Sequence, residues 1–188
     1  MKNTKSKIFT QVDVVGISHQ DTQFSSCRFL ELNIKFSSFE KCHFVNCDFS
    51  GSNFQACNFD HCHFESCKLS WLNFKDVSFT NLKIVDSLLE GCTFMNQKLK
   101  QSYFESTNLS ASIFQKCDLT SSKFIGSDLN RAYFENCILT GANLSGSNLT
   151  GVSFTNCKII KTKLDISGFI SFGNSKGFEL GEVSTPLD

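Results

Sequence analysis

The sequence predicts an all-β solenoid, in which the chain turns once every five residues and stacks in coils. Every fifth residue is apolar from Phe24 to Leu164, an unbroken run of 29 positions filled by 16 Phe, 10 Leu and 3 Ile. Two residues before these central positions, 25 of 29 residues are Cys, Ser, Thr, Ala or Val, and this second register holds all ten cysteines. Self-similarity at a fixed short period indicates a repeat architecture.

A period of five excludes the two regular alternatives. In an α-helix, five residues rotate the chain by about 140° net, so the apolar side chains would spread over every face. In a continuous strand, an odd spacing would send successive apolar residues to opposite faces. The central residue and the residue two before it can share one interior face only if the next two residues form a corner. Glycines at these corners, such as Gly51, Gly91 and Gly126, fit this assignment.

The pentapeptides resemble those of the pentapeptide-repeat family. Segments 49–54 and 142–151 follow the family's pattern of a small residue, Asn or Asp, Leu or Phe, Ser or Thr, and Gly. The resemblance implies a right-handed quadrilateral β-helix with four repeats per coil and about seven to eight coils at the β-ladder spacing. Since no insertion breaks the frame, we expect no projecting loops.

The period also divides the chain into parts. We expect an N-terminal cap and irregular first coil over 1–21, because His19 occupies a central position, and a β-helix over 22–171. Residues 172–188 would form a C-terminal cap or tail that either folds over the last coil or pairs with a second chain. Apolar residues in and just before this tail make this end of the chain a candidate homodimer contact, formed by Phe169, Ile170, Phe172, Phe178 and Leu180.

Four residues of the second register are too large for a tight interior slot: Leu32, Leu72, Leu82 and Gln97. Three of them fall within about one and a half coils, and we expect the rod to bulge or to change its turn type there.

The cysteines follow the repeat and not a functional spacing. Residues twenty apart should stack in columns, such as Cys27, Cys47 and Cys67, and parallel stacked side chains have the wrong geometry for a disulfide. Buried Cys acts as a small apolar residue. Ten reduced thiols favour the cytoplasm.

The N-terminal segment is too polar for a secretory signal, and no apolar run approaches a membrane span.

No motif indicates catalysis, so we predict a protein that is not an enzyme, with no catalytic residues and no cofactor. The weak candidates for a metal site are three histidines in and near a His-Cys-His triplet. Two of them should stack on one face at ladder spacing, near Glu65, while Cys42 and Cys62 point inward and cannot join them. These histidines are His43, His61 and His63.

Outward-facing apolar residues offer an interaction patch. Ile113 and Tyr133 should stack on one face, with Met95 a coil away, and Tyr103 and Trp71 should also face outward. Clustered exposed aromatic residues indicate a protein contact, whereas scattered ones carry no such meaning.

Charge decides how far the family resemblance extends. Its quinolone-resistance members imitate B-DNA in width and negative charge and bind a type II topoisomerase, DNA gyrase. The chain resembles them in length and single-rod layout. Between residues 22 and 171, however, it carries 13 acidic and 14 basic residues, and no face is an acidic stripe. Such a mixed surface lacks the one-signed field of a DNA mimic and also argues against direct nucleic-acid binding.

The sequence therefore predicts a non-catalytic rod that presents flat β faces to a protein partner, without nucleic acid or membrane. A topoisomerase-binding protector, as the resemblance implies, is the first alternative, and a metal-binding or enzymatic repeat protein is the second.

Overall fold

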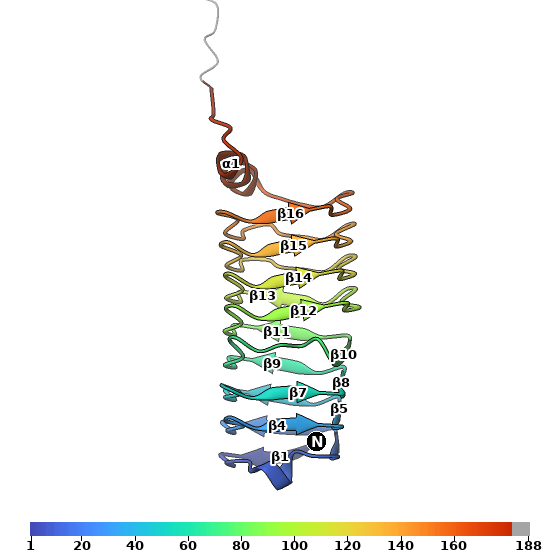
Figure 1. The fold of residues 1–188 in the computed structure, drawn as a ribbon. Helices are drawn as coiled ribbons and strands as arrows, with labels where there is room; N and C mark the ends of the chain where they lie inside the picture. The colour runs from blue at the N-terminus through green and yellow to red at the C-terminus, as the bar shows by residue number, and fades with distance from the viewer. Residues whose placement is uncertain (182–188) are drawn as a thin grey trace, which may run out of the picture.

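The computed structural model describes residues 1–181, which form a rod of about eight stacked coils closed at one end by a helix (Figure 1). Each coil takes twenty residues, because every strand pairs in parallel with residues twenty positions away, as at Phe24 and Phe44 or Phe94 and Phe114. Four five-residue repeats per coil give the rod four faces, which confirms the predicted β-solenoid. We number the faces 1 to 4 in chain order, from those centred on Phe24, Phe29, Ile34 and Phe39.

The strands are short, and three faces contain them. Face 2 is held by isolated bridges alone, from Ile8–Arg28 to Asp128–Asn148. Face 1 carries the six-stranded sheet of β1 (Lys2–Lys5), β3 (Thr22–Ser25), β6 (His43–Val45), β9 (His63–Glu65), β11 (Lys83–Val85) and β13 (Tyr103–Glu105). Face 3 carries β4 (Asn33–Lys35) with β7 (Asn53–Gln55), and then β12 (Thr93–Met95), β14 (Ile113–Gln115), β15 (Tyr133–Glu135) and β16 (Ser153–Thr155). Face 4 carries β2 (Ser18–Gln20), β5 (Ser38–Glu40), β8 (Cys57–Asp60) and β10 (Val77–Thr80).

Phenylalanine rings from successive coils stack along the axis and fill the interior. The ring centroids of Phe29 and Phe49 lie 4.5 Å apart at 3°, and those of Phe94 and Phe114 lie 4.8 Å apart at 4°. This spacing equals that of the β-ladder, so the same translation satisfies both the backbone and the aromatic side chains.

The second register supplies hydrogen-bond donors as well as small volume. The Cys67 thiol donates to the carbonyl of Phe44 at 3.2 Å, and the Ser112 hydroxyl donates to that of Leu89 at 2.7 Å. Both acceptors lie 23 residues earlier, at a corner of the coil below. A buried carbonyl without a donor would be costly, which explains why this register is rich in Cys, Ser and Thr.

The corners place one residue per repeat in the left-handed region, with φ near +50° to +73°. From Gly16 to Lys161, every fifth residue has positive φ except Asp76. This one change of turn type falls in the coil where the oversized Leu72 and Leu82 predicted it.

The β-ladder is interrupted on two faces at that coil. On face 3, β7 has no partner in the coil above it, and pairing resumes one coil higher at Asn73–Thr93. On face 4, β10 has no partner in the coil above it, and pairing resumes one coil higher at Lys98–Asp118. Ring spacing widens to 5.7 Å between Phe54 and Phe74. The oversized Leu72 and Gln97 stand directly above the two openings, whereas the equally large Leu82 lies within an intact ladder on face 1.

The first coil is closed but irregular. β1 pairs with β3, a 3₁₀ turn, η1 (Gln11–Asp13), replaces the regular corner, and β2 carries His19 in a central position. The imidazole of His19 stacks on the ring of Phe39 with centroids 5.8 Å apart.

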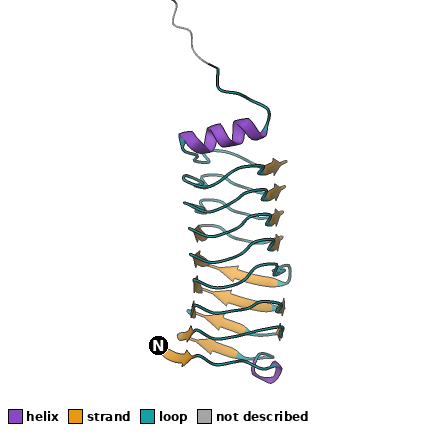
Figure 2. Cartoon of the chain, turned by 90° about the vertical axis from the view of Figure 1, so that its left-hand side faces the viewer, coloured by secondary structure: helices purple, strands orange, loops and turns teal. Residues whose placement is uncertain are grey.

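Helix α1 (Ile166–Ser175) lies across the other end of the rod (Figure 2). Its Gly168 is buried against Leu149 and Leu164, and the ring of Phe172 packs on that of Phe154 at 5.6 Å. The repeat region therefore gives way to a helix at Ile166, and the boundary expected at 171 falls inside it. The physical reason is the Asp165 carboxylate, which caps the helix by accepting from the Gly168 N–H at 2.7 Å. Residues 182–188 of the expected tail lie outside the described residues.

Candidate interaction surfaces

Three of the five residues predicted as an interaction patch share face 3. The β14–β15 pairing places Ile113 directly beside Tyr133, and Met95 lies on β12, one coil away. Ile113 is 40% exposed. These strands form the face toward the viewer in Figure 1. We call Met95, Ile113, Tyr133 and the adjoining Trp71 the face 3 patch.

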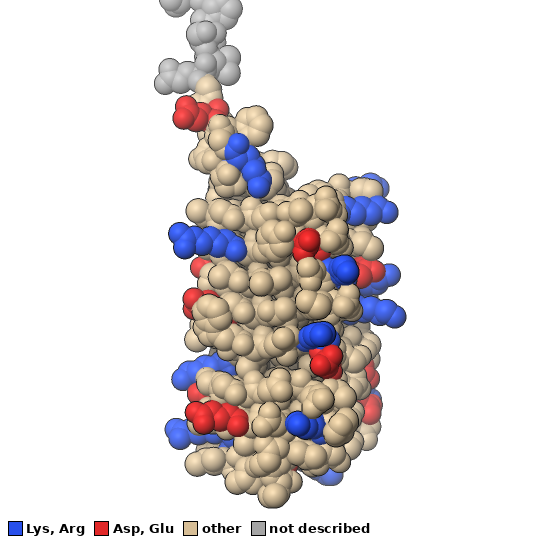
Figure 3. Space-filling view, in the orientation of Figure 1, with Lys and Arg blue, Asp and Glu red and all other residues tan. Residues whose placement is uncertain are grey.

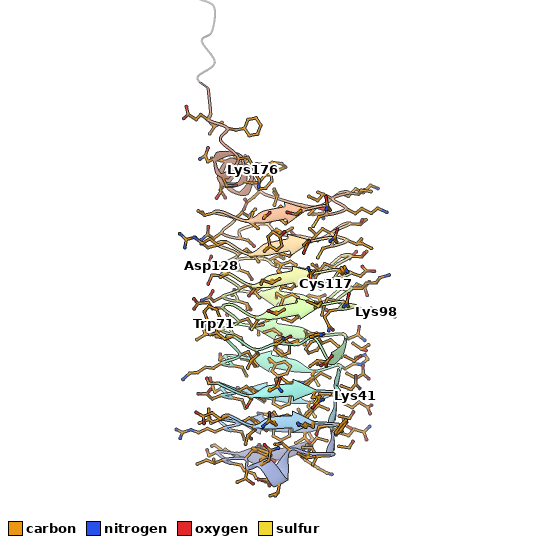
Figure 4. All side chains as sticks on the ribbon, viewed as in Figure 1. Lys41, Trp71, Lys98, Cys117, Asp128 and Lys176 are labelled. Atoms are coloured by element: carbon orange, nitrogen blue, oxygen red, sulfur yellow. The ribbon has the colours of Figure 1, made fainter. Side chains whose placement is uncertain are left out.

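Trp71 stands at the corner between faces 2 and 3 and is 70% exposed (Figure 4). Its indole lies directly over Gly91, where an added Cβ would overlap the atoms of the ring. Ala111 follows Gly91 along this corner, so small residues continue from the indole toward Ile113. The corner thus presents a flat aromatic surface beside the face 3 strands.

Tyr103 does not join this patch. It lies on β13 of face 1, on the opposite side of the rod, where the Lys123 ammonium sits 4.5 Å from its ring centroid. Tyr103 and Ile113 are ten residues apart, which is half a coil, so they lie on opposite faces of the rod.

The three candidate histidines do not converge on one point. His43 and His63 lie side by side on face 1, with ring centroids 5.4 Å apart and the ring planes at 74°, an edge-to-face arrangement. His61 instead lies at the corner, where its Nδ1 is 2.9 Å from the Asp60 carboxylate and its Nε2 is 2.8 Å from the Asn81 amide. Burial and then the nearby Lys83 lower the pKa of His63. Within residues 1–181, no three His, Cys, Asp or Glu side chains are grouped as metal ligands would be.

All ten cysteines are free thiols, and Cys157 in the last coil is the only one not fully buried. Burial raises the pKa of the Cys92 thiol to about 12. Cys92 is therefore a protonated thiol that donates a hydrogen bond inside the rod.

The C-terminal end exposes part of the candidate dimer contact. Phe169, Phe178 and Leu180 are exposed, and with Ile170 they line an apolar hollow of about 200 Å³. Phe172 is held against Phe154 and under the Lys176 ammonium, so it belongs to the cap of the last coil.

The surface mixes charges of both signs (Figure 3). Opposite charges pair between neighbouring coils, with Lys68 3.4 Å from Asp48 on face 2 and Lys100 3.2 Å from Asp118 on face 4. Such exposed pairs contribute little stability, but they cancel any one-signed field along the rod.

The geometry is that of a pentapeptide-repeat solenoid, and sequence comparison agrees. The family profile described as "Pentapeptide repeat region" matches residues 17–94 and 87–164, and the chain belongs to this family. No curated protein sequence matches it significantly.

Solved structures resemble this chain at low identity. A trypsin-treated variant of QnrB1, a plasmid-mediated fluoroquinolone resistance protein, is 20% identical with a TM-score of 0.48, over 95% of this chain and 97% of that one. HetL, a protein involved in heterocyst differentiation regulation in the cyanobacterium Nostoc sp., is 15% identical with a TM-score of 0.33, over 86% and 88% of the two chains.

The helices within residues 1–181 lack the length and the hydrophobicity that a membrane-spanning helix needs.

Proposed function

We propose that this protein is a non-catalytic interaction rod that binds a protein partner through the face 3 patch. The observation that carries the proposal is the adjacency of Ile113 and Tyr133 on one flat sheet, with the exposed Trp71 indole at its edge. Aromatic residues on a flat rigid surface are typical anchors of protein interfaces. The Gln115 amide, hydrogen-bonded to Glu135 beside the patch, supplies a polar rim.

The test uses a pair of matched variants. Ile113 and Ile138 occupy the same position in their repeats and are 40% and 38% exposed, but only Ile113 lies in the patch. Tagged wild type, Ile113→Glu and Ile138→Glu are used to capture partners from the source cell, and the captured proteins are quantified by mass spectrometry. We expect a partner that the wild type and Ile138→Glu retain and that Ile113→Glu loses. If both variants capture the same proteins as the wild type, the patch is not the contact.

The topoisomerase alternative is decided by a supercoiling assay with purified DNA gyrase and a fluoroquinolone. The mixed charge of every face argues against DNA mimicry, so we expect no protection by a molar excess of the protein. Protection would instead indicate a fluoroquinolone-resistance function like that of QnrB1.

We also propose that a second copy of the chain covers the exposed end of α1, through Phe169, Ile170, Phe178 and Leu180. Sedimentation equilibrium should then give twice the chain mass, and Phe169→Glu should return the particle to the monomer mass. A monomeric wild type would refute this contact.

The ten free thiols support a place in the reducing cytoplasm. Fractionation of the source cell, with blotting for this protein, would test this location.

A further inference from the structure

The opening on face 4 leaves a row of backbone groups without their usual partners. Above it, three hydrogen bonds per rung join successive coils: Asp118 N to Gln97 O at 2.9 Å, Leu99 N to Asp118 O at 2.8 Å, and Gln101 N to Thr120 O at 2.9 Å. One coil below, the three equivalent bonds are absent from the backbone network: Lys98 N to Val77 O, Phe79 N to Lys98 O, and Asn81 N to Lys100 O. The upper edge of β10 is therefore an unpaired strand edge in the middle of the rod.

The buried side chain of Gln97 holds this opening. It stands in the second register directly above Val77, where most repeats have Cys or Ser. Its Nε2 still makes the usual bond of that register, to the carbonyl of Phe74 at 2.9 Å, and a second to that of Met95 at 3.2 Å. A longer side chain anchored at the same carbonyl needs more height than a thiol, so the coils separate.

The opening forms a groove lined mainly by basic and amide side chains. Its volume is about 790 Å³, and a second hollow of about 600 Å³ adjoins it at Asn81 and Gln101. Lys98 projects from this side of the rod in Figure 4. One acid, Asp118, is in the lining and is paired with Lys100. The lysines of the two hollows are Lys75, Lys83, Lys98, Lys100 and Lys123.

We propose that this groove binds an extended acidic segment of a protein partner, which adds as a β-strand to the open edge of β10. The edge offers both acceptors and donors, from the Val77 carbonyl to the Phe79 and Asn81 N–H groups. That alternation is what a peptide backbone pairs with, whereas a phosphate group would need donors alone. Unpaired strand edges are where proteins accept a foreign strand, and the lysines select for acidic side chains.

This site is separate from the face 3 patch, and its test does not involve Ile113 or Tyr133. The probe is a fluorescein-labelled Val-Glu-Val-Glu-Val-Glu peptide with blocked ends, titrated with the full chain and followed by fluorescence polarisation. We expect saturable binding that weakens as salt is raised. A Val-Lys-Val-Lys-Val-Lys peptide should not bind. Two further peptides carry N-methyl groups on all Val or on all Glu residues. Each keeps the charge but loses the backbone donors of one side of the strand. At least one of the two should therefore fail to bind.

Two variants separate geometry from charge. Gln97→Ser restores the usual small donor, and we expect it to close the ladder and to abolish binding. Lys98→Glu should weaken binding by about tenfold or more, equivalent to about 1.4 kcal/mol. Lys158→Glu is the control, because Lys158 lies in the same column of face 4 where the ladder is intact, with its N–H 2.8 Å from the Cys137 carbonyl. It should bind like the wild type.

Several results would overturn the proposal. One is failure of the acidic peptide to bind, and another is binding of both N-methylated peptides as tightly as the unmodified one. Retained binding in a folded Gln97→Ser, or equal effects of Lys98→Glu and Lys158→Glu, would do the same. Displacement of the peptide by tripolyphosphate at matched charge would show a simple anion groove instead. Circular dichroism checks that each variant is folded, and if Gln97→Ser fails to fold, the N-methylated peptides and the lysine pair still decide the question.

Discussion

At the scale of the residue, the second register does two tasks. A thiol or hydroxyl there is small enough to leave space for the stacked rings, and it also satisfies a corner carbonyl of the coil below, as Cys92 does for Leu69 at 2.9 Å. Cysteine suits both tasks, because it has the volume of a small apolar residue and a weak S–H donor. Its abundance is therefore structural.

This role predicts a graded reactivity of the thiols. In the folded protein, dithionitrobenzoate should modify Cys157 first and slowly, since hydrogen bonding to Cys137 and burial raise its pKa. All ten thiols should react after unfolding in guanidinium. Fast reaction of several thiols in the native state would contradict the interior placement.

The raised pKa of Cys92 also predicts a loss of stability at high pH. A thiol whose folded pKa is about 12 stabilises the fold fully below its unfolded pKa of about 8.5 and progressively less as the pH rises toward 12. Urea unfolding curves from pH 8 to pH 11 should show this decline, and Cys92→Ser should make it shallower.

At the scale of the element, the corner at Trp71 is built on one glycine. Gly91 has φ +65°, and its missing side chain makes room for the indole ring. A side chain there would displace the ring and incur the cost of the left-handed conformation.

Gly91→Ala should therefore move the indole, and the fluorescence of this sole tryptophan reports it directly. We expect a shift of the emission maximum and weaker capture of the partner. Gly126→Ala is the control, because Gly126 has nearly the same φ, +67°, and the nearest atom to its added Cβ is 3.7 Å away. An equal change of emission in both variants would contradict the contact between Trp71 and Gly91.

The helix that closes the rod depends on a single carboxylate. Asp165 accepts from the N–H groups of Gly168 and Gly146, both at 2.7 Å, so it joins α1 to the preceding coil. These two bonds, with that of Ser167, lower the pKa of Asp165.

Asp165→Ala should increase hydrogen exchange at the Gly168 and Gly146 amides, and Asp165→Asn should restore most of the protection, since Asn also caps helices. Because the folded pKa is lowered, the contribution of Asp165 is present above its unfolded value of about 3.9 and is lost as the pH falls further. Unchanged exchange in Asp165→Ala would show that packing of Phe172 alone holds the helix.

At the scale of the whole molecule, the period of five predicted the solenoid, the interior residues and the disturbed coil. It did not predict the end of the β-helix, because Phe169 happens to continue the apolar spacing inside α1. It also did not predict which ladder opens. The sequence singles out Leu72, Leu82 and Gln97 alike, but the ladder opens below Leu72, which lies over Ser52, and stays paired at Leu82, which lies over Cys62. The size of the side chain beneath therefore does not decide which ladder opens, and the spacing of large residues alone could not predict it.

The interrupted ladder should be visible along the rod by amide exchange. We expect the N–H groups of Phe79, Asn81 and Lys98 to exchange quickly, and the equivalent groups of Leu99, Gln101 and Asp118 one coil higher to be protected. Nuclear magnetic resonance exchange rates in the free protein compare the two sets directly. Equal protection would mean that the opening on face 4 is closed in solution.

Because paired strands are always twenty residues apart, the position of a residue within its twenty-residue coil decides which face of the rod it occupies. Deleting one whole coil would shorten the molecule and leave every later side chain pointing in its original direction. Deleting one pentapeptide between Trp71 and Ile113 would keep the interior pattern but rotate everything beyond it by a quarter turn. Ile113 and Tyr133 would then no longer lie on the face beside Trp71. Changes in length that preserve function in such a chain should therefore come in multiples of four repeats.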